Sequence, residues 1–433
     1  MGRRLLAAWI TFFLVCPGSA GSDEGMAGNI DLGTARRYFR EFQRLCGDDD
    51  GQLWGRTLCG PILLVDPPTR GVVANRADDA GVLQPRAGVF VGKLPEDVGI
   101  ANTAVEWSGT RWTMLMWWSL AEERARRLSL LAHEAFHRIQ PELELVAFGE
   151  MCAHLDTADG RFWLQLEWNA LQQALSAEGD ARREALADAL TFRAARRDRF
   201  PEAAEREIPL EIFEGLAEYT GMRLAGFSGE EVLETISRKR ESDTGFVRSF
   251  AYVSGPLYGY LLDGGGVAWR KRTGSETDLA GLLAELLEVS PRAVEVATRR
   301  SAVYGGVDLR TVEDERERKR QERLGAWRAS LIDGPVLIVD LTEVSSGSFD
   351  PHRVFPFGER QTVYTTRELI AEWGRLTVDD GAILEDETHG RGHVSLSGAA
   401  KDRTAGDGWS LELNAGWVVV PSDRAGDFVV RPE

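Results

Sequence analysis

The chain has 433 residues, of which 43% are hydrophobic and 27% charged, so it exceeds the usual size of one domain and can bury a large core. This composition excludes a disordered, collagen-like or coiled-coil protein. Acidic residues outnumber basic ones by 68 to 51, giving a net charge of −17, and so acidic a chain offers no general basic surface for nucleic acid or anionic lipid. We therefore expect no nucleic-acid partner.

Residues 1–20 are predicted to be a secretory signal peptide. A positively charged start precedes an apolar stretch from Leu5 to Cys16, and small residues mark a cleavage site after Ala20. The stretch is too short to span a bilayer comfortably, and no other segment has 18 consecutive apolar residues. We expect an exported protein, extracellular or periplasmic, with no membrane-spanning segment after cleavage.

Cleavage would leave three cysteines: Cys46, Cys59 and Cys152. In an oxidising compartment Cys46 and Cys59 are the expected disulfide, because they flank a short turn-like Gly-Asp-Asp-Asp-Gly insert. Cys152 would then be a free, buried thiol, although it could instead pair with either of the other two. Cysteines so scattered lack the spacing of a zinc cluster, and the aspartate run lacks the register of a calcium loop.

The chain is predicted to be an α+β protein with a separate C-terminal β domain. Residues 21–333 form the first domain, β-rich over 53–118 and helical over 119–332, and residues 334–433 form an all-β domain, expected to be a sandwich. Strands are expected at Ile62–Val65, Gly71–Ala74, Gly88–Val91, Thr103–Trp107, Trp112–Trp118, Val336–Asp340, Val363–Tyr364, Gly374–Val378, Leu411–Leu413 and Trp417–Val420.

The helical part begins with a helix over Leu120–Gln140, where Ser119 and Glu122 suggest a capping box and Pro141 marks the end. Further helices are expected at Arg161–Leu175, Ala181–Arg199, Pro209–Leu224, Glu230–Lys239, Phe250–Leu262, Leu279–Leu287, Pro291–Arg300 and Val312–Ile332, the last as a solvated, highly charged helix.

The first of these helices carries the sequence His133-Glu134-Ala-Phe-His137. Four residues turn a helix by about 400°, so both histidines share one face and can bind one Zn²⁺. Glu134 lies about 100° around the helix, where its carboxylate can reach a metal-activated water without ligating the metal, which is why H-E-x-x-H marks metal-dependent hydrolases. The alternative is a pair of surface histidines, but the apolar neighbours place this helix in an interior.

A third ligand is expected on a second helix. The metzincin pattern fails because Gln140 and Leu143 occupy its positions, but the segment Glu211-Ile-Phe-Glu214-Gly-Leu-Ala-Glu218 resembles the E-G-x-A segment of the gluzincin zinc metallopeptidases, thermolysin-like and aminopeptidase-like. The resemblance implies that Glu214 is the third ligand and that Glu218 orients a ligand histidine. Glu211 is the reserve ligand, and an exposed helical acid is the alternative for each glutamate.

A tyrosine further along extends the resemblance. Tyr252 and Gly255 keep the spacing of the Y-x-K-G segment of aminopeptidase-like gluzincins, with Ser254 in place of the lysine. The resemblance implies that the Tyr252 hydroxyl hydrogen-bonds the oxyanion of the tetrahedral intermediate. A core tyrosine is the alternative, and Tyr258 is the second candidate.

The resemblance spans roughly residues 110–263 and implies a zincin-like catalytic domain with one Zn²⁺. It implies a secreted metallopeptidase in which Glu134 is the general base and a peptide or protein is the substrate. Glu214 follows His137 by 77 residues, a longer gap than in aminopeptidases, and no G-x-M-E-N segment is present, so endopeptidase and aminopeptidase remain open. A non-peptidase zinc hydrolase, or a binding protein with a structural or vestigial metal site, is the alternative.

Two minor features complete the sequence-based predictions. The run Trp112–Trp118 lies where zincins place the edge strand that binds an extended peptide, and core packing is its alternative. The remaining histidines are expected to be no part of the site, because glycines break the spacing of one pair and the others are isolated: His389, His393, His154 and His352.

Overall fold

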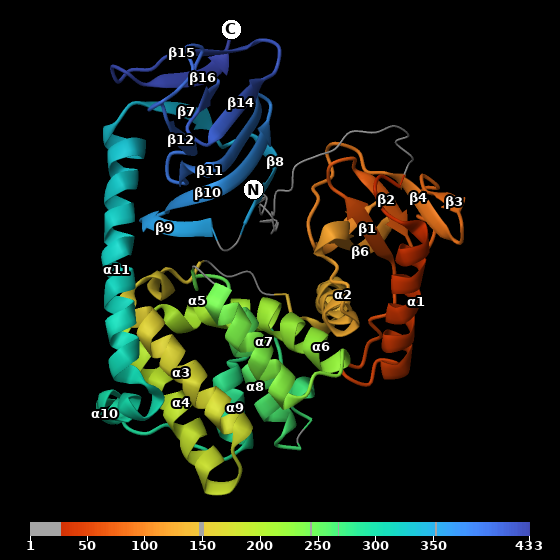
Figure 1. The fold of residues 1–433 in the computed structure, drawn as a ribbon, viewed down its shortest axis with the longest axis vertical. Helices are drawn as coiled ribbons and strands as arrows, with labels where there is room; N and C mark the ends of the chain where they lie inside the picture. The colour runs from red at the N-terminus through yellow and green to blue at the C-terminus, as the bar shows by residue number, and fades with distance from the viewer. Residues whose placement is uncertain (1–26, 147–150, 243–244, 267, 351–352) are drawn as a thin grey trace. The chain divides into compact units, whose positions relative to one another are not determined.

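The structure, a computed structural model, describes residues 27–146, 151–242, 245–266, 268–350 and 353–433. The predicted signal peptide and His352 lie outside the described residues. In the described part of the chain, no helix is long and apolar enough to cross a membrane. The chain is a mixed α/β protein with an N-terminal β region, a helical middle and a C-terminal all-β region (Figure 1).

By packing, the described chain divides into two compact units, one ending at Glu313 and the other beginning with the next residue. The sequence-based boundary stood later, at residue 334. The division falls inside helix α11 (Gly306–Arg328), because the last turn of α11 packs with the C-terminal β region: the rings of Trp327 and Phe355 lie 5.2 Å apart.

Helix α1 (Leu32–Asp49) and a six-stranded sheet form the N-terminal β region. Its sheet order is β3-β4-β2-β1-β6-β5, and of these neighbouring pairs β1 and β6 are parallel while the others are antiparallel. Strands β1 and β2 consist of buried aliphatic runs, as expected for the middle of a sheet. The strands are β1 (Ile62–Asp66), β2 (Gly71–Ala74), β3 (Gln84–Arg86), β4 (Val89–Lys93), β5 (Thr103–Trp107) and β6 (Thr110–Met116).

Strand β6 is not the edge strand that the sequence suggested for the Trp112–Trp118 run. It pairs with β1 on one side and with β5 on the other. Trp112 is fully buried and donates its indole N–H to the carbonyl oxygen of Trp107, so it packs in the core. Nearly every residue of β6 is buried, which fits an interior strand, and β5 occupies the edge.

The helical middle follows the predicted sequence of helices, with shifted ends. One predicted helix, Pro209–Leu224, is in fact built from α5, a π-helical turn η4 and α6. The helices are α2 (Arg124–Ile139), α3 (Ala158–Ser176), α4 (Gly179–Arg199), α5 (Ala203–Leu210), η4 (Glu211–Gly215), α6 (Leu216–Leu224), α7 (Gly229–Ser242), α8 (Ala251–Asp263), α9 (Leu279–Leu286) and α10 (Ala297–Ser301). Short turns are η1 (Trp117–Ser119), η2 (Gln140–Leu143), η3 (Ala153–Asp156), η5 (Trp269–Arg272), η6 (Val294–Val296), η7 (Ala302–Tyr304) and η8 (Ala329–Asp333).

Helix α2 begins later than the sequence predicted, and the capping box at Ser119 and Glu122 does not form. The Ser119 hydroxyl donates to the carbonyl oxygen of Met116, in the turn η1. The N-cap is Glu123, whose carboxylate accepts the backbone N–H of Ala125 at 3.0 Å. Helix α2 therefore begins at Arg124, directly after the side chain that caps it.

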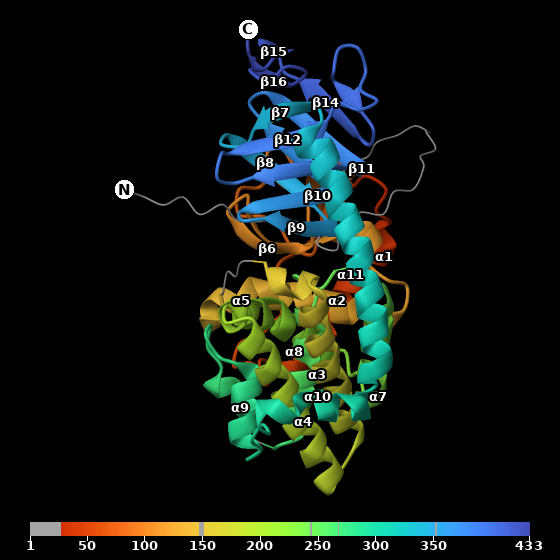
Figure 2. The ribbon, with the colours of Figure 1, turned by 90° about the vertical axis from the view of Figure 1, so that its left-hand side faces the viewer.

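In the C-terminal β region, ten strands form one hydrogen-bonded network. The two long strands β10 and β11 run side by side (Figure 2), and successive parts of β10 pair with β9 and β8. The strands are β7 (Val336–Asp340), β8 (Val344–Phe349), β9 (Val354–Gly358), β10 (Gln361–Ala371), β11 (Gly374–Asp386), β12 (Arg391–Ser395), β13 (Ala405–Gly406), β14 (Trp409–Leu413), β15 (Trp417–Pro421) and β16 (Phe428–Pro432).

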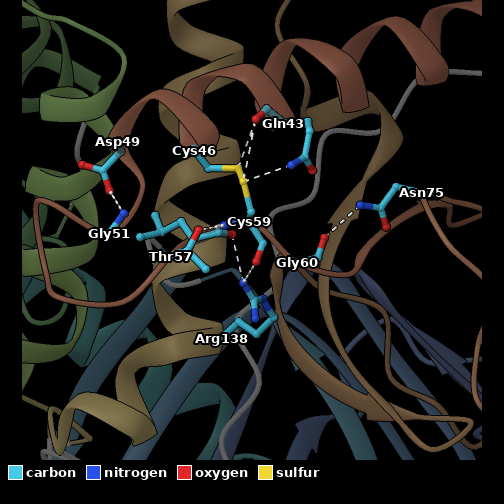
Figure 3. Close-up of a disulfide and its surroundings, with 10 residues drawn as sticks. Gln43, Cys46, Asp49, Gly51, Thr57, Cys59, Gly60, Asn75 and Arg138 are labelled. Atoms are coloured by element: carbon cyan, nitrogen blue, oxygen red, sulfur yellow. Dashed lines mark hydrogen bonds between the residues drawn. A yellow bond between two sulfur atoms is a disulfide. The ribbon is translucent and has the colours of Figure 1, made fainter.

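Cys152 is free and buried, as predicted. The predicted disulfide between Cys46 and Cys59 is confirmed (Figure 3). The disulfide closes the loop between the last turn of α1 and the segment that leads into β1. Arg138, near the end of α2, donates from Nη2 to the carbonyl oxygens of Leu58 and Cys59 at 2.9 and 3.2 Å. The closed loop is thereby fastened to α2.

Trp54 fastens the same loop to a second helix. Its ring packs on that of Phe136, on α2, at a centroid distance of 4.9 Å. Its indole N–H donates to the hydroxyl of Thr220, on α6, at 2.9 Å. The disulfide-closed loop thus contacts both α2 and α6.

Removing this disulfide should lower the free energy of unfolding by about 3 kcal/mol, because the open loop gains conformational freedom in the unfolded chain. The test is urea unfolding of wild type and a Cys46→Ala/Cys59→Ala double variant. Dithiothreitol should lower wild-type stability to that of the double variant and leave the double variant unchanged. Equal stability of the two oxidised proteins would contradict this expectation.

Candidate metal centre

Helix α2 presents His133 and His137 on one buried face. Helix residues around them, among them Leu131, Ala132 and Phe136, belong to the core, which explains why this helix lies in the interior. The two histidines are only 5% and 8% exposed, and their Nε2 atoms lie 3.1 Å apart. Two ring nitrogens that converge in this way can offer their lone pairs to one cation.

Glu214 reaches the same point from the π-helical turn η4. Its Oε2 lies 3.4 Å from Nε2 of His137 and 3.7 Å from Nε2 of His133, and the residue is 3% exposed. The structure therefore brings the three predicted ligands together, although 77 residues separate Glu214 from His137. Single π-helical turns within helices occur frequently at functional sites.

Glu134 lies beside the two histidines. Glu134, His133 and His137 are buried, and each offers a ligand atom within 4.8 Å of the others. Its Oε2 has no hydrogen-bond partner among the described residues, and burial raises the pKa of this carboxyl group. A buried carboxylate oxygen without a partner is unfavourable unless a cation or a donor completes it. The group His133, Glu134 and His137 can therefore hold a metal ion.

The other ring nitrogen of each histidine faces an acceptor. Nδ1 of His133 lies 3.0 Å from Oε2 of Glu218, which has Lys239 on its other oxygen at 3.0 Å. Nδ1 of His137 lies 2.7 Å from Oε1 of Gln140. These contacts favour the proton on Nδ1 and leave Nε2 free to ligate, the arrangement common around metal-bound histidines.

The charges of the cluster stabilise one another. Burial alone would lower the pKa of His133, but its contacts with Glu214 and Glu218 raise it to about 10, so a metal ion that binds Nε2 has to displace a proton from this ring. Burial alone would raise the pKa values of both glutamates. The histidines instead hold that of Glu214 well below its usual range, and Lys239 with His133 brings that of Glu218 to about 2. Both carboxylates are ionised at neutral pH and suit a cation.

Tyr252 of α8 completes the cluster. Its hydroxyl donates to Oε2 of Glu214 at 2.9 Å, and its ring stacks on that of His133 at a centroid distance of 5.8 Å. Burial and the neighbouring Glu214 raise the pKa of this hydroxyl well above its usual value, so it remains a donor. The reserve candidate Tyr258 lies elsewhere, because its hydroxyl donates to Glu167 at 2.7 Å.

The reserve ligand Glu211 also points away from the cluster. Both its oxygens accept from the guanidinium of Arg193, which bonds Glu167 as well at 2.9 Å. All three residues are essentially buried, so this ion pair is a structural anchor of η4 rather than part of the site. The sequence alone could not separate Glu211 from Glu214.

Close helix packing also holds η4. A Cβ added at Gly255, on α8, would lie about 2.2 Å from the Cα of Gly215, on η4, a distance that no real Cβ tolerates. Glycine at position 255 therefore allows α8 to approach the turn that carries Glu214. The packing of α8 on η4 therefore accounts for the glycine three residues after Tyr252, and no contact with a substrate is needed to explain it.

A second buried ion pair lies behind η4, and it predicts how stability depends on pH. Glu207 accepts from Arg196 at 2.6 Å and contacts Nε2 of His154 at 2.9 Å. Burial alone would raise the pKa of Glu207, but Arg196 and His154 hold it well below its usual value. A carboxyl group whose pKa is lower in the folded than in the unfolded protein contributes stability above its unfolded pKa of about 4.3. This contribution is lost as the pH falls toward the folded-state pKa.

We therefore expect the free energy of unfolding to decline steeply below about pH 4 and the decline to be shallower in Glu207→Gln. The test is urea unfolding of both proteins between pH 3 and 7. Glu205→Gln, an exposed position on the same helix, is the matched control and should keep the wild-type slope. A wild-type slope in Glu207→Gln would contradict the expectation.

Two residues of the cluster were missed by the sequence-based prediction. Gln140 lies three positions after His137 and so shares its side of the helix, a signal that was available. Lys239 comes from α7, and no local pattern connects it with Glu218.

The aspartate run within the disulfide-closed loop has a structural role. Asp49 accepts backbone N–H groups of the following loop.

The other described histidines lie outside the cluster. His154 contacts Glu207, as given above. His389 lies in the turn after β11, with Nδ1 3.0 Å from Oδ2 of Asp386, and His393 lies on β12. Among the described residues, a group with the geometry of a metal site is found only around His133, Glu134 and His137.

Comparison with known proteins gives no relative: no family model matches the chain, and no curated protein or solved structure matches it.

Proposed function

We propose that this protein is a secreted zinc-dependent metallopeptidase with a gluzincin-like site. The observation that carries the proposal is the buried convergence of Nε2 of His133, Nε2 of His137 and Oε2 of Glu214, with Glu134 beside them. Two imidazoles and one carboxylate, with room left for a water, are the ligand set of catalytic rather than structural zinc.

A bound Zn²⁺ would supply Lewis acidity, which polarises a carbonyl group and makes water nucleophilic at neutral pH. Glu134 would accept a proton from the attacking water and return it to the leaving amine. The raised pKa of this carboxyl group suits such a role, because a carboxylate with a higher pKa is a stronger base. Tyr252 would donate a hydrogen bond to the oxyanion that forms on the substrate once its hydroxyl turns from Glu214.

The arrangement around α2 supports a peptide as substrate. Helix α2 packs against β5 and β6, and β5 is one of the two edge strands of the six-stranded sheet. An extended peptide could pair with this edge strand through main-chain hydrogen bonds, and such pairing does not depend on the sequence of the peptide. We assign a zincin-like fold to this region because the strands of the sheet are followed in the chain by helix α2 and then by the turn η4, which carries Glu214.

Two observations bear on export. The first 20 residues have the pattern of a signal peptide, and the disulfide between Cys46 and Cys59 is typical of oxidising compartments. We therefore assign the protein to the extracellular space or the periplasm.

The alternatives are a non-peptidase zinc hydrolase and a binding protein with a structural metal site. A structural site needs no base, so the buried Glu134 favours an enzyme.

The proposal is tested by metal analysis together with hydrolysis of an unfolded protein. We expect one zinc ion per chain, loss of proteolysis after removal of zinc by a chelator, and recovery when zinc is restored. Stoichiometric zinc without proteolysis, combined with hydrolysis of esters, would favour the non-peptidase enzyme. Absence of bound zinc in the wild type would reject the proposed function.

A further inference from the structure

We propose that Gln140 is a positioning residue that holds His137 and Glu214 in register, an inference that rests on the proposed metal site. Gln140 is the C-cap of α2 and is fully buried. Its backbone carbonyl oxygen accepts the N–H of Leu145 at 3.0 Å, and Pro141 follows, so its main chain is well fixed. The side chain contacts both α2 and η4.

The two ends of the Gln140 amide have different partners. Its Nε2 donates to the backbone carbonyl oxygens of Phe213 at 2.9 Å and of Ile212 at 3.4 Å. Since carbonyl oxygens only accept, the amide nitrogen must face η4 and the amide oxygen must face His137. The oxygen therefore accepts the Nδ1 proton of His137 at 2.7 Å, which leaves Nε2 with its lone pair toward the cluster.

One amide thus connects segments that are more than seventy residues apart in the chain. Phe213 adds a second contact, because its ring packs on that of His137 at 4.6 Å, and Glu214 is the next residue. A shift of η4 relative to α2 would break both contacts and move the Glu214 carboxylate away from the histidines. The Gln140 side chain opposes this shift directly.

The comparison with His133 shows why an amide is needed here. Nδ1 of His133 faces a carboxylate, Glu218, whose second oxygen faces the ammonium group of Lys239. A carboxylate at position 140 could also accept from His137, but its second oxygen would face the carbonyl oxygens of Ile212 and Phe213. Only a group that both accepts and donates satisfies the two sides.

This difference gives the test. Full-length Gln140→Glu keeps an acceptor for His137 and loses the donor to η4, whereas Gln140→Leu loses both. Gln165→Leu is the matched control, because Gln165 also donates its amide to a distant partner, Glu313, at 2.6 Å but lies away from the cluster. Zinc affinity is measured by competition with a chromophoric chelator, Co²⁺ geometry by its visible absorption, and the order of η4 by hydrogen exchange in the metal-free proteins.

We expect Gln140→Glu and Gln140→Leu each to lower zinc affinity by about 10–100-fold, to alter the Co²⁺ spectrum and to speed exchange at residues 211–216, while Gln165→Leu does none of these. Wild-type affinity and exchange in Gln140→Glu would overturn the inference, since orientation of His137 alone would then suffice. If the wild type binds zinc and Gln140→Leu has the same zinc affinity, Co²⁺ spectrum and exchange rates, the inference is also overturned, but the proposed function stands. A wild type without zinc would reject the proposed function, and the inference with it.

Discussion

Glu134→Gln should lower the rate of peptide hydrolysis by about 10²–10⁴-fold while the protein keeps its zinc. Glutamine has nearly the same shape as glutamate but cannot accept a proton at neutral pH. The two histidines and Glu214 would remain in place, because no hydrogen bond from a described residue reaches Oε2 of Glu134. The expected result is thus a folded, metal-loaded and inactive protein.

The measurement pairs zinc content with the initial rate of cleavage of an unfolded protein. Glu142→Gln is the control, because Glu142 is exposed and lies just after the same helix, and it should keep full activity. Zinc lost together with activity would make Glu134 a ligand, which its place within 4.8 Å of both histidines would allow. Full activity in Glu134→Gln would reject the assigned role of general base.

The sequence was sufficient for the part of the site that lies on one helix. His133, Glu134 and His137 are related by helical geometry alone, so their spacing already predicts a shared face, and the predicted disulfide depends on an equally local loop. The outline of β-rich, helical and β-rich regions also followed from local patterns. Helix α1 could have been found in the same way, because Asp31 caps it and Tyr38, Phe39, Phe42 and Cys46 recur at helical spacing.

Features that depend on contacts between distant segments were not available from the sequence. The start of α2 was wrong because a capping pattern at Ser119 competes with the turn η1, in which this hydroxyl donates to Met116. The pairing of β10 with both β8 and β9 was not predicted, because neither of these two strands was expected from its local pattern. Lys239 could not be anticipated, since it meets Glu218 only through the packing of α7.

The clearest case is the pair Glu211 and Glu214, three residues apart and alike in the sequence. The partner of each decides its role: Arg193 holds Glu211, whereas the histidines of α2 surround Glu214. Arg193 comes from α4, and its position relative to η4 follows only from the packed helices. Two similar acids therefore have separate functions that a pair of variants can distinguish.

Glu214→Ala should lower zinc affinity by more than about 100-fold, because loss of a residue that merely orients a ligand already costs about 10–100-fold. Glu214→Ala should also lower the stability of the metal-free protein, because His133, His137 and Tyr252 lose a buried carboxylate partner, so zinc affinity is the readout that separates the two variants. Glu211→Ala should lower the free energy of unfolding by about 3–5 kcal/mol, because it breaks a buried ion pair and leaves Arg193 short of a partner, but it should keep the zinc affinity of the wild type.

Chelator competition and urea unfolding of both metal-free variants provide the two readouts. Because the substitutions are identical in kind and lie on one π-helical turn, each variant is the control of the other. A large loss of affinity in Glu214→Ala with a large loss of stability in Glu211→Ala would support the assignment. Wild-type affinity in Glu214→Ala would exclude Glu214 as the third ligand, and with Glu211 bound to Arg193 it would leave Glu134 as the carboxylate that groups with both histidines.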